Sequence, residues 1–460
     1  MHYDVVIIGA GMSGLAAGIR LACYEKSVCI LEKHYAFGGL NSYYTLNRRP
    51  YDVGLHALTN YVPASDRHAP LNRVLRQLRI PREELDLHEQ GYSEIRFPDH
   101  RLRFSNGLGR LTGEVAEVFP DQIDGFRRLG ADIAAAPYEV EDRGDSARAF
   151  LRGYLTDDTL IDMILCPLMF YGNAREHDMD VAPFVVMFRS IFHEGFARPR
   201  EGVRVIIKAL VRQFRKFGGK LRMSCGVSRI EVAGDRVTAL TLENGETITA
   251  DKIFSCAGYV ETMNLCGGDG DPQLQEQTGK VSFTESVSVI DRRSADLDIG
   301  AAITFFCTTP TFTYARPDGL IDPRSGVLCC PDNYQGHEDM AEGVVRLTTL
   351  ADHDRWSALS EEAYALAKVA CFDEAVDAVT MFVRDFRPHT IDRDIFTPVT
   401  IRRFTGHLGG AVYGSPRKTP DGRTRYANLF LCGTDQGFSG IIGAMLSGVI
   451  VANAHGLIVD

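Results

Sequence analysis

The first 32 residues contain the pattern that most restricts how this chain can fold. A short apolar run over 4–8 is followed by Gly-x-Gly-x-x-Gly, by apolar residues at helical spacing, and by a second apolar run that ends at Glu32. This order predicts a strand, a tight turn, a helix and a parallel strand, the unit that binds a dinucleotide with its pyrophosphate at the helix N-terminus. Glu32 stands where a carboxylate can accept hydrogen bonds from the adenosine ribose, which favours FAD or NAD over NADP. The loop residues expected at the cofactor are Gly9, Gly11, Met12, Ser13 and Gly14.

A glycine pair, Gly38-Gly39, follows soon after this acid. Two glycines there would let the chain pass close to the pyrophosphate and ribityl groups, although an ordinary glycine turn is the alternative. The pair resembles the second glycine motif of the amine-oxidase-like flavoproteins, which favours FAD over NAD. Many members of that family have arginine next, where this chain has Leu40, so no cationic contact is expected from that position. The cofactor-binding residues predicted in this stretch are Lys33, Gly38, Gly39, Leu40 and Asn41.

Turn signals in the middle of the chain predict a β-meander over 221–258. Gly234-Asp235 and Asn244-Gly245 are both typical of hairpins. In flavoproteins with two dinucleotide-binding domains, such a meander crosses the FAD domain. The resemblance implies that Val227 contacts adenine through its backbone and that Gly258 belongs to the small-residue turn that ends the module.

A second glycine-rich stretch, GTDQGFSGIIGAMLSG, occupies 433–448 after a predicted strand over 428–432. By resemblance, Gly433 opens a turn in which Asp435 matches the acid that holds a ribityl hydroxyl. Backbone N–H groups around Gly440, Ile441 and Ile442 would begin a helix whose positive end faces the flavin pyrimidine. The N-terminal loop is therefore expected to hold the pyrophosphate, and this loop the ring of the same FAD.

Together these features resemble the phytoene desaturase, carotenoid isomerase and retinol saturase group of FAD oxidoreductases. The likeness extends through both ends and most of the middle, including FTPVTIRRFTGHLGGAVYG over 396–414; YDVGLHALTN over 51–60 and the C-terminal stretch are closer to the isomerase and saturase branches. The resemblance implies hydride exchange between flavin N5 and a C–C bond of an apolar isoprenoid or polyene, in desaturation, saturation or isomerisation. It brings no obligatory catalytic side chain. His56 and Tyr413 are the two candidates for a catalytic role, and a structural role is the alternative for each.

The expected fold class is α/β, a Rossmann-type FAD-binding domain of the two-dinucleotide-binding-domain type with an inserted α+β substrate domain. We assign 1–59, 200–264 and 396–460 to the FAD domain, and 60–199 and 265–395 to the substrate domain. Two apolar stretches over 159–174 and 181–192 supply either helix core or the lining of a long apolar tunnel. The tunnel hypothesis names Met163, Met169, Phe170, Phe184 and Phe188.

Charge and cysteine content narrow the function classes. The net charge of −10 makes nucleic acid an improbable partner. The 11 cysteines show no metal-ligand spacing, so no metal site is expected, and the absence of a secretion-signal pattern favours the cytoplasm. A single dinucleotide loop of the N-terminal type leaves the electron donor or acceptor unassigned.

Two segments bear on membrane contact. Residues 440–459 are nearly uncharged and are interpreted as a buried helix rather than a membrane span. Residues 203–217 form a basic amphipathic pattern, which predicts a helix packed on the nucleotide-binding sheet, with a membrane-surface helix as the alternative. Because a carotenoid-like substrate is delivered from lipid, peripheral membrane contact stays open.

Three rival functions share the expected fold. One is an FAD amine oxidase, which the single tryptophan, Trp356, far from the flavin motifs, disfavours because such enzymes often use aromatic residues beside the flavin. A protoporphyrinogen-oxidase-like enzyme is the second. The third is a prenyl-binding carrier without flavin, which the presence of Glu32, Gly39 and Asp435 disfavours.

Overall fold

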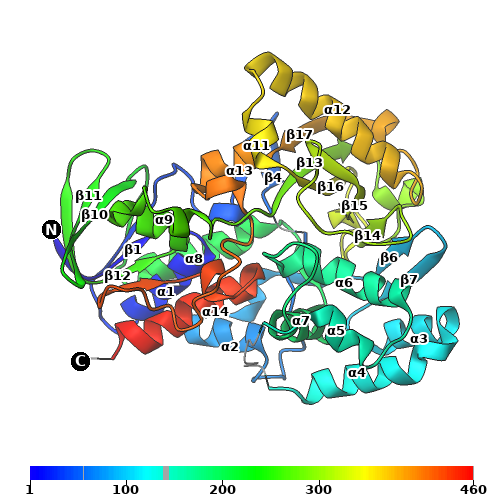
Figure 1. Ribbon diagram of the computed structural model, residues 1–460, viewed down its shortest axis with the longest axis horizontal. Coiled ribbons are helices and arrows are strands. Elements are labelled where there is room, and N and C mark those ends of the chain that lie inside the picture. Colours follow the sequence, from blue (N-terminus) through cyan, green and yellow to red (C-terminus); the bar gives the residue numbers. More distant parts are fainter. Residues whose placement is uncertain (55, 138–143, 459–460) are drawn as a thin grey trace.

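The chain folds around two seven-stranded sheets, each covered by helices (Figure 1). This computed structural model describes residues 1–54, 56–137 and 144–458. The first sheet has the order β10-β11-β12-β1-β2-β9, with β18 paired to β12. Its strands are β1 (His2–Ile8), β2 (Val28–Leu31), β9 (Lys220–Arg222), β10 (Val227–Ala233), β11 (Arg236–Leu242), β12 (Thr247–Ser255) and β18 (Leu429–Leu431). Strand β1 lies parallel between β2 and β12, and β9 and β18 extend the parallel part. This arrangement confirms the predicted Rossmann-type domain.

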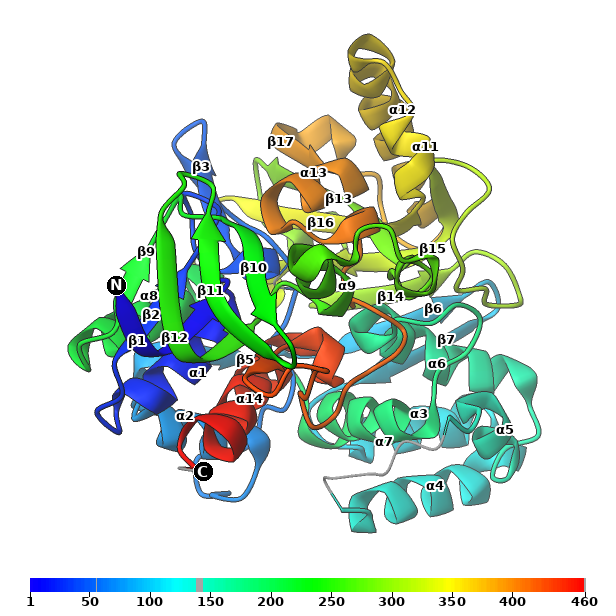
Figure 2. The same ribbon diagram turned by 60° about the vertical axis from the view of Figure 1, so that its left-hand side comes forward.

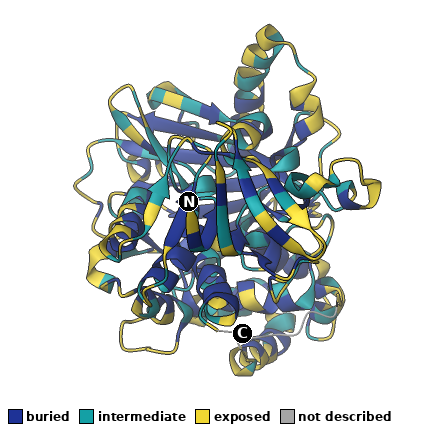
Figure 3. Cartoon of the chain, turned by 90° about the vertical axis from the view of Figure 1, so that its left-hand side faces the viewer, coloured by how far each residue is buried: buried dark blue, intermediate teal, exposed yellow. Residues whose placement is uncertain are grey.

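Strand β1 is apolar on both sides because both faces of this sheet are covered. Val5 and Ile7 face a core shared with helices, whereas Val6 and Ile8 face a core shared with the meander strands β10 and β11. The alternation follows from the two-residue period of a strand. Figure 3 shows the middle of this sheet buried, and the edge strand β10 carries several exposed residues.

Four helices share the core on one face of this sheet: α1 (Met12–Ala22), α2 (Pro70–Leu78), α8 (Val203–Lys216) and α14 (Gly440–Val451). The apolar side of α8 is buried there and its basic side faces outward, as predicted for a helix packed on the sheet. Helix α2 differs from the expected division, because Leu71, Leu75 and Leu78 pack in the core of the first sheet although they lie in the 60–199 range. The chain therefore returns to the first domain after residue 60 before it enters the second.

The second sheet has the order β17-β13-β16-β15-β14-β6-β7 and is antiparallel except at the β14–β6 pair. Its strands are β6 (Ser93–Phe97), β7 (His100–Phe104), β13 (Ser282–Ile290), β14 (Ile303–Cys307), β15 (Ile321–Cys329), β16 (Gly343–Ala351) and β17 (Thr390–Phe396). A layer of helices shares an aromatic-rich core with one face: α3 (Gly109–Val118), α4 (Ile123–Ala135), α5 (Ala147–Arg152), α6 (Asp158–Gly172) and α7 (Val181–Phe188). Helices α11 (His353–Ser357) and α12 (Glu361–Val379) pack in a separate core with this sheet, and Figure 2 shows α12 projecting from the body of the molecule.

The remaining elements are short. They are the hairpin of β3 (Tyr43–Leu46) and β4 (Arg49–Asp52), the paired strands β5 (Leu87–Glu89) and β8 (Ala197–Pro199), and the helices α9 (Tyr259–Met263), α10 (Pro272–Gln275) and α13 (Pro398–Thr405).

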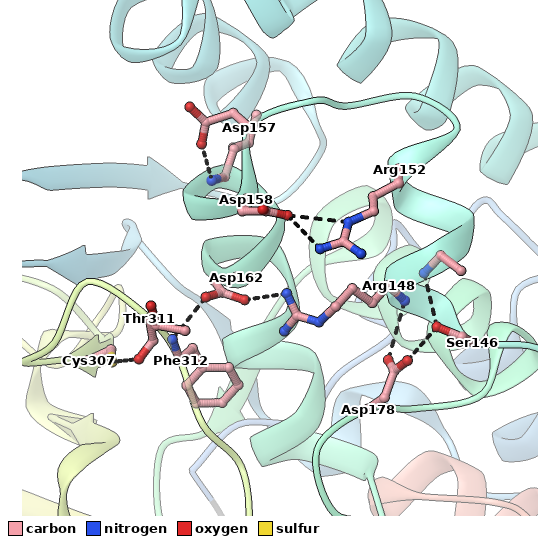
Figure 4. A network of polar contacts seen from close by, with 12 residues as sticks. Ser146, Arg148, Arg152, Asp157, Asp158, Asp162, Asp178, Cys307, Thr311 and Phe312 are labelled. Carbon is pink, nitrogen blue, oxygen red and sulfur yellow. Dashed lines mark hydrogen bonds and ion pairs between the residues drawn. The ribbon is translucent and has the colours of Figure 1, made fainter.

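A buried carboxylate joins the helical layer to the second sheet. Asp162 of α6 pairs with Arg148 Nη1 of α5 at 2.6 Å and accepts a hydrogen bond from the Phe312 backbone N–H at 2.9 Å, in the loop that follows β14 (Figure 4). Asp157 caps the N-terminus of α6 by accepting from Leu160 N at 2.9 Å. These contacts fix the otherwise apolar α6, which presents one end to the region between the two sheets.

Within the described ranges, no helix combines the length and the apolar composition needed to cross a membrane. The apolar stretch 440–459 forms α14, which ends at Val451, and a π-turn over Ala452–Gly456; Val459 lies outside the described residues. Helix α14 packs against α1, as expected for a buried helix.

Candidate cofactor and active site

A cavity of about 760 Å³ lies at the junction of the two sheets and is lined by residues of both. Segments distant in sequence meet around it: 8–13, 31–44, 53–54, 56–59, 256–265, 394–413 and 433–444. The two glycine-rich stretches at opposite ends of the chain therefore line one cavity. Its volume falls within the range of about 300–1,000 Å³ typical of ligand sites.

The N-terminal loop is shaped by close backbone approach. Gly9 has φ +101°, in the left-handed region, and a Cβ on Gly14 would lie 2.1 Å from the Gly9 carbonyl oxygen. Gly9, Gly11, Met12 and Ser13 line the cavity, whereas Gly14 lies behind them at the contact between α1 and the turn. Helix α1 begins at Met12 without a side-chain cap, so its first N–H groups are available to a ligand anion.

Glu32 and Lys33 line the cavity next to this loop. The Glu32 carboxylate accepts hydrogen bonds from Ala10 N at 2.7 Å and from His34 N at 2.8 Å. One side chain thus orients the glycine loop and also stands at the cavity wall. Lys33 Nζ pairs with the partly exposed Glu243 at 2.9 Å.

The second glycine motif contacts the first. Gly38 donates its N–H to Ala10 O at 2.9 Å and has φ +113°, and a Cβ there would lie 2.8 Å from Ile207 Cδ1. Gly39 also has positive φ, +57°. The four predicted residues of this motif, Gly38, Gly39, Leu40 and Asn41, line the cavity. The glycines are required here by backbone conformation and by the narrow gap beside α8.

The meander contributes one wall. Val227, the first residue of β10, lines the cavity, as do Cys256 and Ala257 at the end of β12. Gly258, with φ +100°, turns the chain there and does not itself line the cavity. It is a turn residue whose two preceding neighbours reach the site.

The C-terminal loop differs in detail from the sequence expectation. Gly433, Thr434, Gly440 and Ile441 line the cavity, whereas Asp435 does not. Both Asp435 oxygens face protein backbone: Oδ2 accepts from Tyr259 N at 2.6 Å and Oδ1 from Ser415 N at 2.8 Å. Asp435 thus binds three chain segments together behind the wall, and its neighbour Thr434 lines the cavity instead.

Ile442 is likewise placed in the core behind the cavity, while α14 directs its N-terminus at the cavity through Gly440 and Ile441. Ser439, the residue before α14, makes no side-chain cap. Two helix N-termini, those of α1 and α14, therefore converge on one site. A dinucleotide with an anionic pyrophosphate in its middle and an electron-accepting ring at one end fits this arrangement of donors.

Sequence reasoning missed a polar corner where the second sheet meets the cavity. It consists of His56, Tyr171, Glu285 and Thr348, which line the cavity, together with Arg346 behind them. Glu285 and Thr348 are paired across β13 and β16, and Arg346 lies two residues from Thr348 on the same face. The available signal was a lone charge in each of two strand-like apolar runs, 282–290 and 343–351. Only the strand pairing brings these charges together.

The corner is held by specific contacts. His56 Nε2 lies 3.2 Å from Thr348 Oγ1 and 3.6 Å from Glu285 Oε1, and Arg346 Nε donates to the same Glu285 oxygen at 2.6 Å. Burial acts to raise the pKa of Glu285, but Arg346 and His56 outweigh it and hold the pKa at about 2. Burial also lowers the pKa of His56, which Glu285 offsets only in part. At neutral pH the corner therefore contains a carboxylate, a guanidinium and a neutral imidazole.

Aromatic residues form the wall beside this corner. Phe170, Tyr171, Phe283 and Tyr413 line the cavity, and Tyr413 Oη donates to the Phe170 carbonyl oxygen at 2.5 Å. Burial raises the pKa of Tyr413. Of the residues named for a tunnel, only Phe170 lines the cavity. The others belong to the core of the helical layer: Met163, Met169, Phe184 and Phe188.

In the part of the chain that the structure describes, no group of three or more His, Cys, Asp or Glu side chains is placed to hold a metal ion. All 11 cysteines are free thiols. The chemistry available to the cavity comes from the backbone donors of the two loops, the polar corner and the aromatic wall.

Several known proteins are similar to this chain over nearly its whole length. The family described as "Flavin containing amine oxidoreductase" matches residues 12–454. Prolycopene isomerase 1, chloroplastic, from an Oncidium hybrid cultivar is 23% identical, over 98% of this chain and 83% of that protein. All-trans-retinol 13,14-reductase from Danio rerio is 28% identical, over 98% of this chain and 86% of that protein. Among solved structures, an oxidoreductase from Methanosarcina mazei has a TM-score of 0.69 at 15% sequence identity, covering 98% of this chain and 100% of its own.

Proposed function

The chain belongs to the family of flavin containing amine oxidoreductases and is an FAD-dependent oxidoreductase, and we propose that it acts on a carbon–carbon bond of an apolar isoprenoid or polyene. The observation that supports this substrate class is the continuity of the cavity, which the two glycine loops line at one side and the aromatic wall lines at the other. Two relatives similar over nearly the whole chain are named for prolycopene isomerisation and for retinol 13,14-reduction, which is consistent with this class.

The residues predicted to hold FAD would contact different parts of the cofactor. The N-terminus of α1 and the glycines of the first two motifs would hold the pyrophosphate, with Glu32 at the adenosine ribose. Val227 would face adenine, and Thr434 and the N-terminus of α14 would face the ribityl and ring end. Asp435 supports this end from behind by fixing Tyr259 and Ser415.

Bound FAD supplies a group that accepts or gives a hydride, which desaturation or saturation of a C–C bond requires. Aromatic side chains align the hydrocarbon chain, and apolar burial worth roughly 25 cal/mol per Å² supplies affinity without ion pairs. Desaturation removes two hydrogens from a C–C bond and saturation adds two, so a proton is transferred together with each hydride. Neutral His56, beside Glu285 and Thr348, would be the group that takes this proton in desaturation, and in saturation its protonated form would give one.

The test is anaerobic mixing of the purified holoenzyme with a panel of polyenes, and with the same panel after photoreduction, while flavin absorbance is followed and products are separated by chromatography. We expect one or more polyenes, and no amine, to change the flavin spectrum or to be isomerised. Flavin reduction by amines alone would favour an amine oxidase, and a colourless protein that binds prenyl groups would favour a carrier.

His56 can be tested within the same assay. We expect His56→Asn to slow turnover by about 10- to 100-fold with FAD still bound, because positioning and proton transfer are shared with the flavin and solvent. A loss of more than about 10⁴-fold with an unchanged flavin spectrum would make His56 an essential acid or base.

The proposal also includes a cytoplasmic location with peripheral membrane contact. Free thiols at all 11 cysteines fit a reducing compartment. Leu366 and Val369 on α12 are 69% and 46% exposed, and an apolar substrate has to be taken from lipid. Sedimentation with lipid vesicles, in low and high salt, tests this contact; recovery of the whole protein in the supernatant under both conditions would contradict it.

A further inference from the structure

We propose that the polar corner formed by Tyr171, His56, Thr348 and Glu285 binds an oxygen-bearing group of the substrate, so that the preferred substrate is an isoprenoid alcohol rather than a pure hydrocarbon. This inference rests on the proposed function and narrows its substrate class. It concerns the part of the cavity that the second sheet and α6 provide.

The Tyr171 hydroxyl is the first observation. Tyr171 lines the cavity, and its hydroxyl oxygen is buried with no hydrogen-bond partner among the residues that the structure describes. Its ring is stacked on Phe196 at 5.4 Å and lies edge-on to Phe305 at 5.2 Å, so the side chain is held in place. A buried hydroxyl without a partner costs about 1–3 kcal/mol. A hydrocarbon would leave that cost in place, whereas a substrate oxygen would remove it.

The neighbouring groups supply the complementary partner. The Tyr171 and His56 rings are 6.2 Å apart, which places the hydroxyl-bearing ring beside the imidazole that contacts Thr348 and Glu285. Burial raises the pKa of Tyr171, so at neutral pH it is a donor, while Glu285 is ionised and accepts only. An alcohol both accepts and donates, and it can therefore satisfy both kinds of group at once.

The electrostatics of the corner favour a polar rather than an ionised substrate group. Arg346 pairs with Glu285 through its Nε at 2.6 Å, so its charge is largely compensated within the wall. A second ion pair, Arg198 to Asp52 at 2.5 Å, lies close by, since Arg198 Nη1 also donates to the His56 carbonyl oxygen at 3.3 Å. A substrate carboxylate would face the Glu285 carboxylate and be repelled. A neutral hydroxyl suits this balance.

The consequence is selectivity. Sites built to hydrogen-bond a substrate hydroxyl discriminate strongly against the analogue that lacks it, because buried polar groups are then left unpaired. The corner would also fix which carbon–carbon bond reaches the flavin, because it anchors one end of an otherwise featureless chain.

The experiment compares two polyenes of equal length, one with a terminal hydroxyl and one with a methyl group in its place, on the holoenzyme. We expect kcat/KM for the alcohol to exceed that for the hydrocarbon by at least about 100-fold. Tyr171→Phe should reduce this ratio by about 10-fold or more and leave the flavin spectrum and FAD affinity unchanged. Tyr413→Phe is the matched control, since its hydroxyl already donates to Phe170 O, and it should change both rates by the same factor.

The outcomes separate this inference from the proposed function. Equal turnover of the two polyenes would overturn the alcohol subsite and leave the proposed function standing. Turnover of neither would contradict the proposed function itself. A shifted flavin spectrum or weakened FAD binding in Tyr171→Phe would assign the corner to the cofactor and overturn the inference.

Discussion

Gly448 of α14 lies against the carbonyl oxygen of Ser13 in α1, so closely that a Cβ on Gly448 would stand 2.1 Å from that oxygen. Ser13 and the N-terminus of α14 both reach the cavity, so this contact sets how the two glycine-rich loops face each other. We expect Gly448→Ala to separate the two helices, to lower stability by several kcal/mol and to lose FAD. Gly443→Ala on the same helix is the control, because its Cβ would meet Phe438 only at 3.4 Å, an ordinary contact. Full flavin content and an unchanged Tm in Gly448→Ala would refute this account.

Removal of the Glu32 carboxylate should weaken both FAD binding and the fold. Glu32 orients the glycine loop through Ala10 N and His34 N as well as facing the cavity. We expect Glu32→Ala to raise the FAD dissociation constant by about 10- to 100-fold, which corresponds to the loss of roughly one charge-assisted hydrogen bond. Flavin titration of the stripped protein measures it. The wild-type flavin is expected to be non-covalent and to appear in the supernatant after heat or acid precipitation as FAD; flavin left in the pellet would contradict this.

We predict that Asp435 affects FAD binding indirectly, by holding the backbone of neighbouring segments in place. Because its oxygens accept from Tyr259 N and Ser415 N, Asp435→Ala would leave two buried N–H groups without that acceptor. We expect a loss of about 2–6 kcal/mol in the free energy of unfolding, measured by urea titration of the flavin-stripped protein. If Asp435→Ala weakens FAD binding and leaves the stripped protein equally stable, the direct ribityl contact inferred from the sequence is correct instead.

Two phenylalanines of the helical layer should respond differently to truncation. Phe188 lies in the core of the layer, whereas Phe170 also lines the cavity. Phe188→Ala is expected to cost about 3–5 kcal/mol of stability with little change in substrate preference. Phe170→Ala should additionally change KM for the polyene. Equal effects on KM from the two variants would revive the tunnel hypothesis for Phe188.

Acid should destabilise the protein through Glu285. Its pKa in the folded protein is about 2, below the ordinary value of 4.5, so its contribution to stability is full above pH 4.5 and is lost as the pH falls toward 2. The contribution is on the order of 3 kcal/mol, since one pKa unit corresponds to about 1.4 kcal/mol. Glu285→Gln, which cannot titrate, should be less stable at pH 7 and should lose less stability between pH 5 and pH 3. Parallel pH profiles of the two proteins, from urea unfolding, would refute the assignment.

The parts of the fold that follow from short-range rules could be predicted from the sequence. The structural roles of Gly9 and Gly14 follow from the sequence because a tight turn and a close helix require them within one local unit, and the meander follows from its two turn signals. The same short-range rules do not predict contacts between residues that are far apart in the sequence. Glu285 and Arg346 meet only because β13 and β16 pair in a particular register, which no local pattern specifies.

Which residue of a loop lines the cavity depends on local backbone geometry that spacing cannot resolve. A short 3-10 helix over Thr434–Gln436 decides that Thr434 faces the cavity and Asp435 faces the backbone behind it. In the same way, the apolar helices of the second domain are recognised as helices, but which of their faces borders the cavity depends on tertiary packing. The place of α2 in the fold illustrates the same limit, since only its contacts in the core of the first sheet show which sheet it covers.

The cavity also has a consequence for the order of events during synthesis. Residues 8–13 leave the ribosome long before Gly433, Thr434 and Ile441, and the wall that they share is complete only after more than 400 further residues have followed. The first βαβ unit can form early, but one edge of it stays unpaired until β12 pairs with β1, and β18 pairs with β12 later still. A complete flavin site therefore forms only after the C-terminal loop has been synthesised, and until then the nascent chain is an incomplete apoprotein.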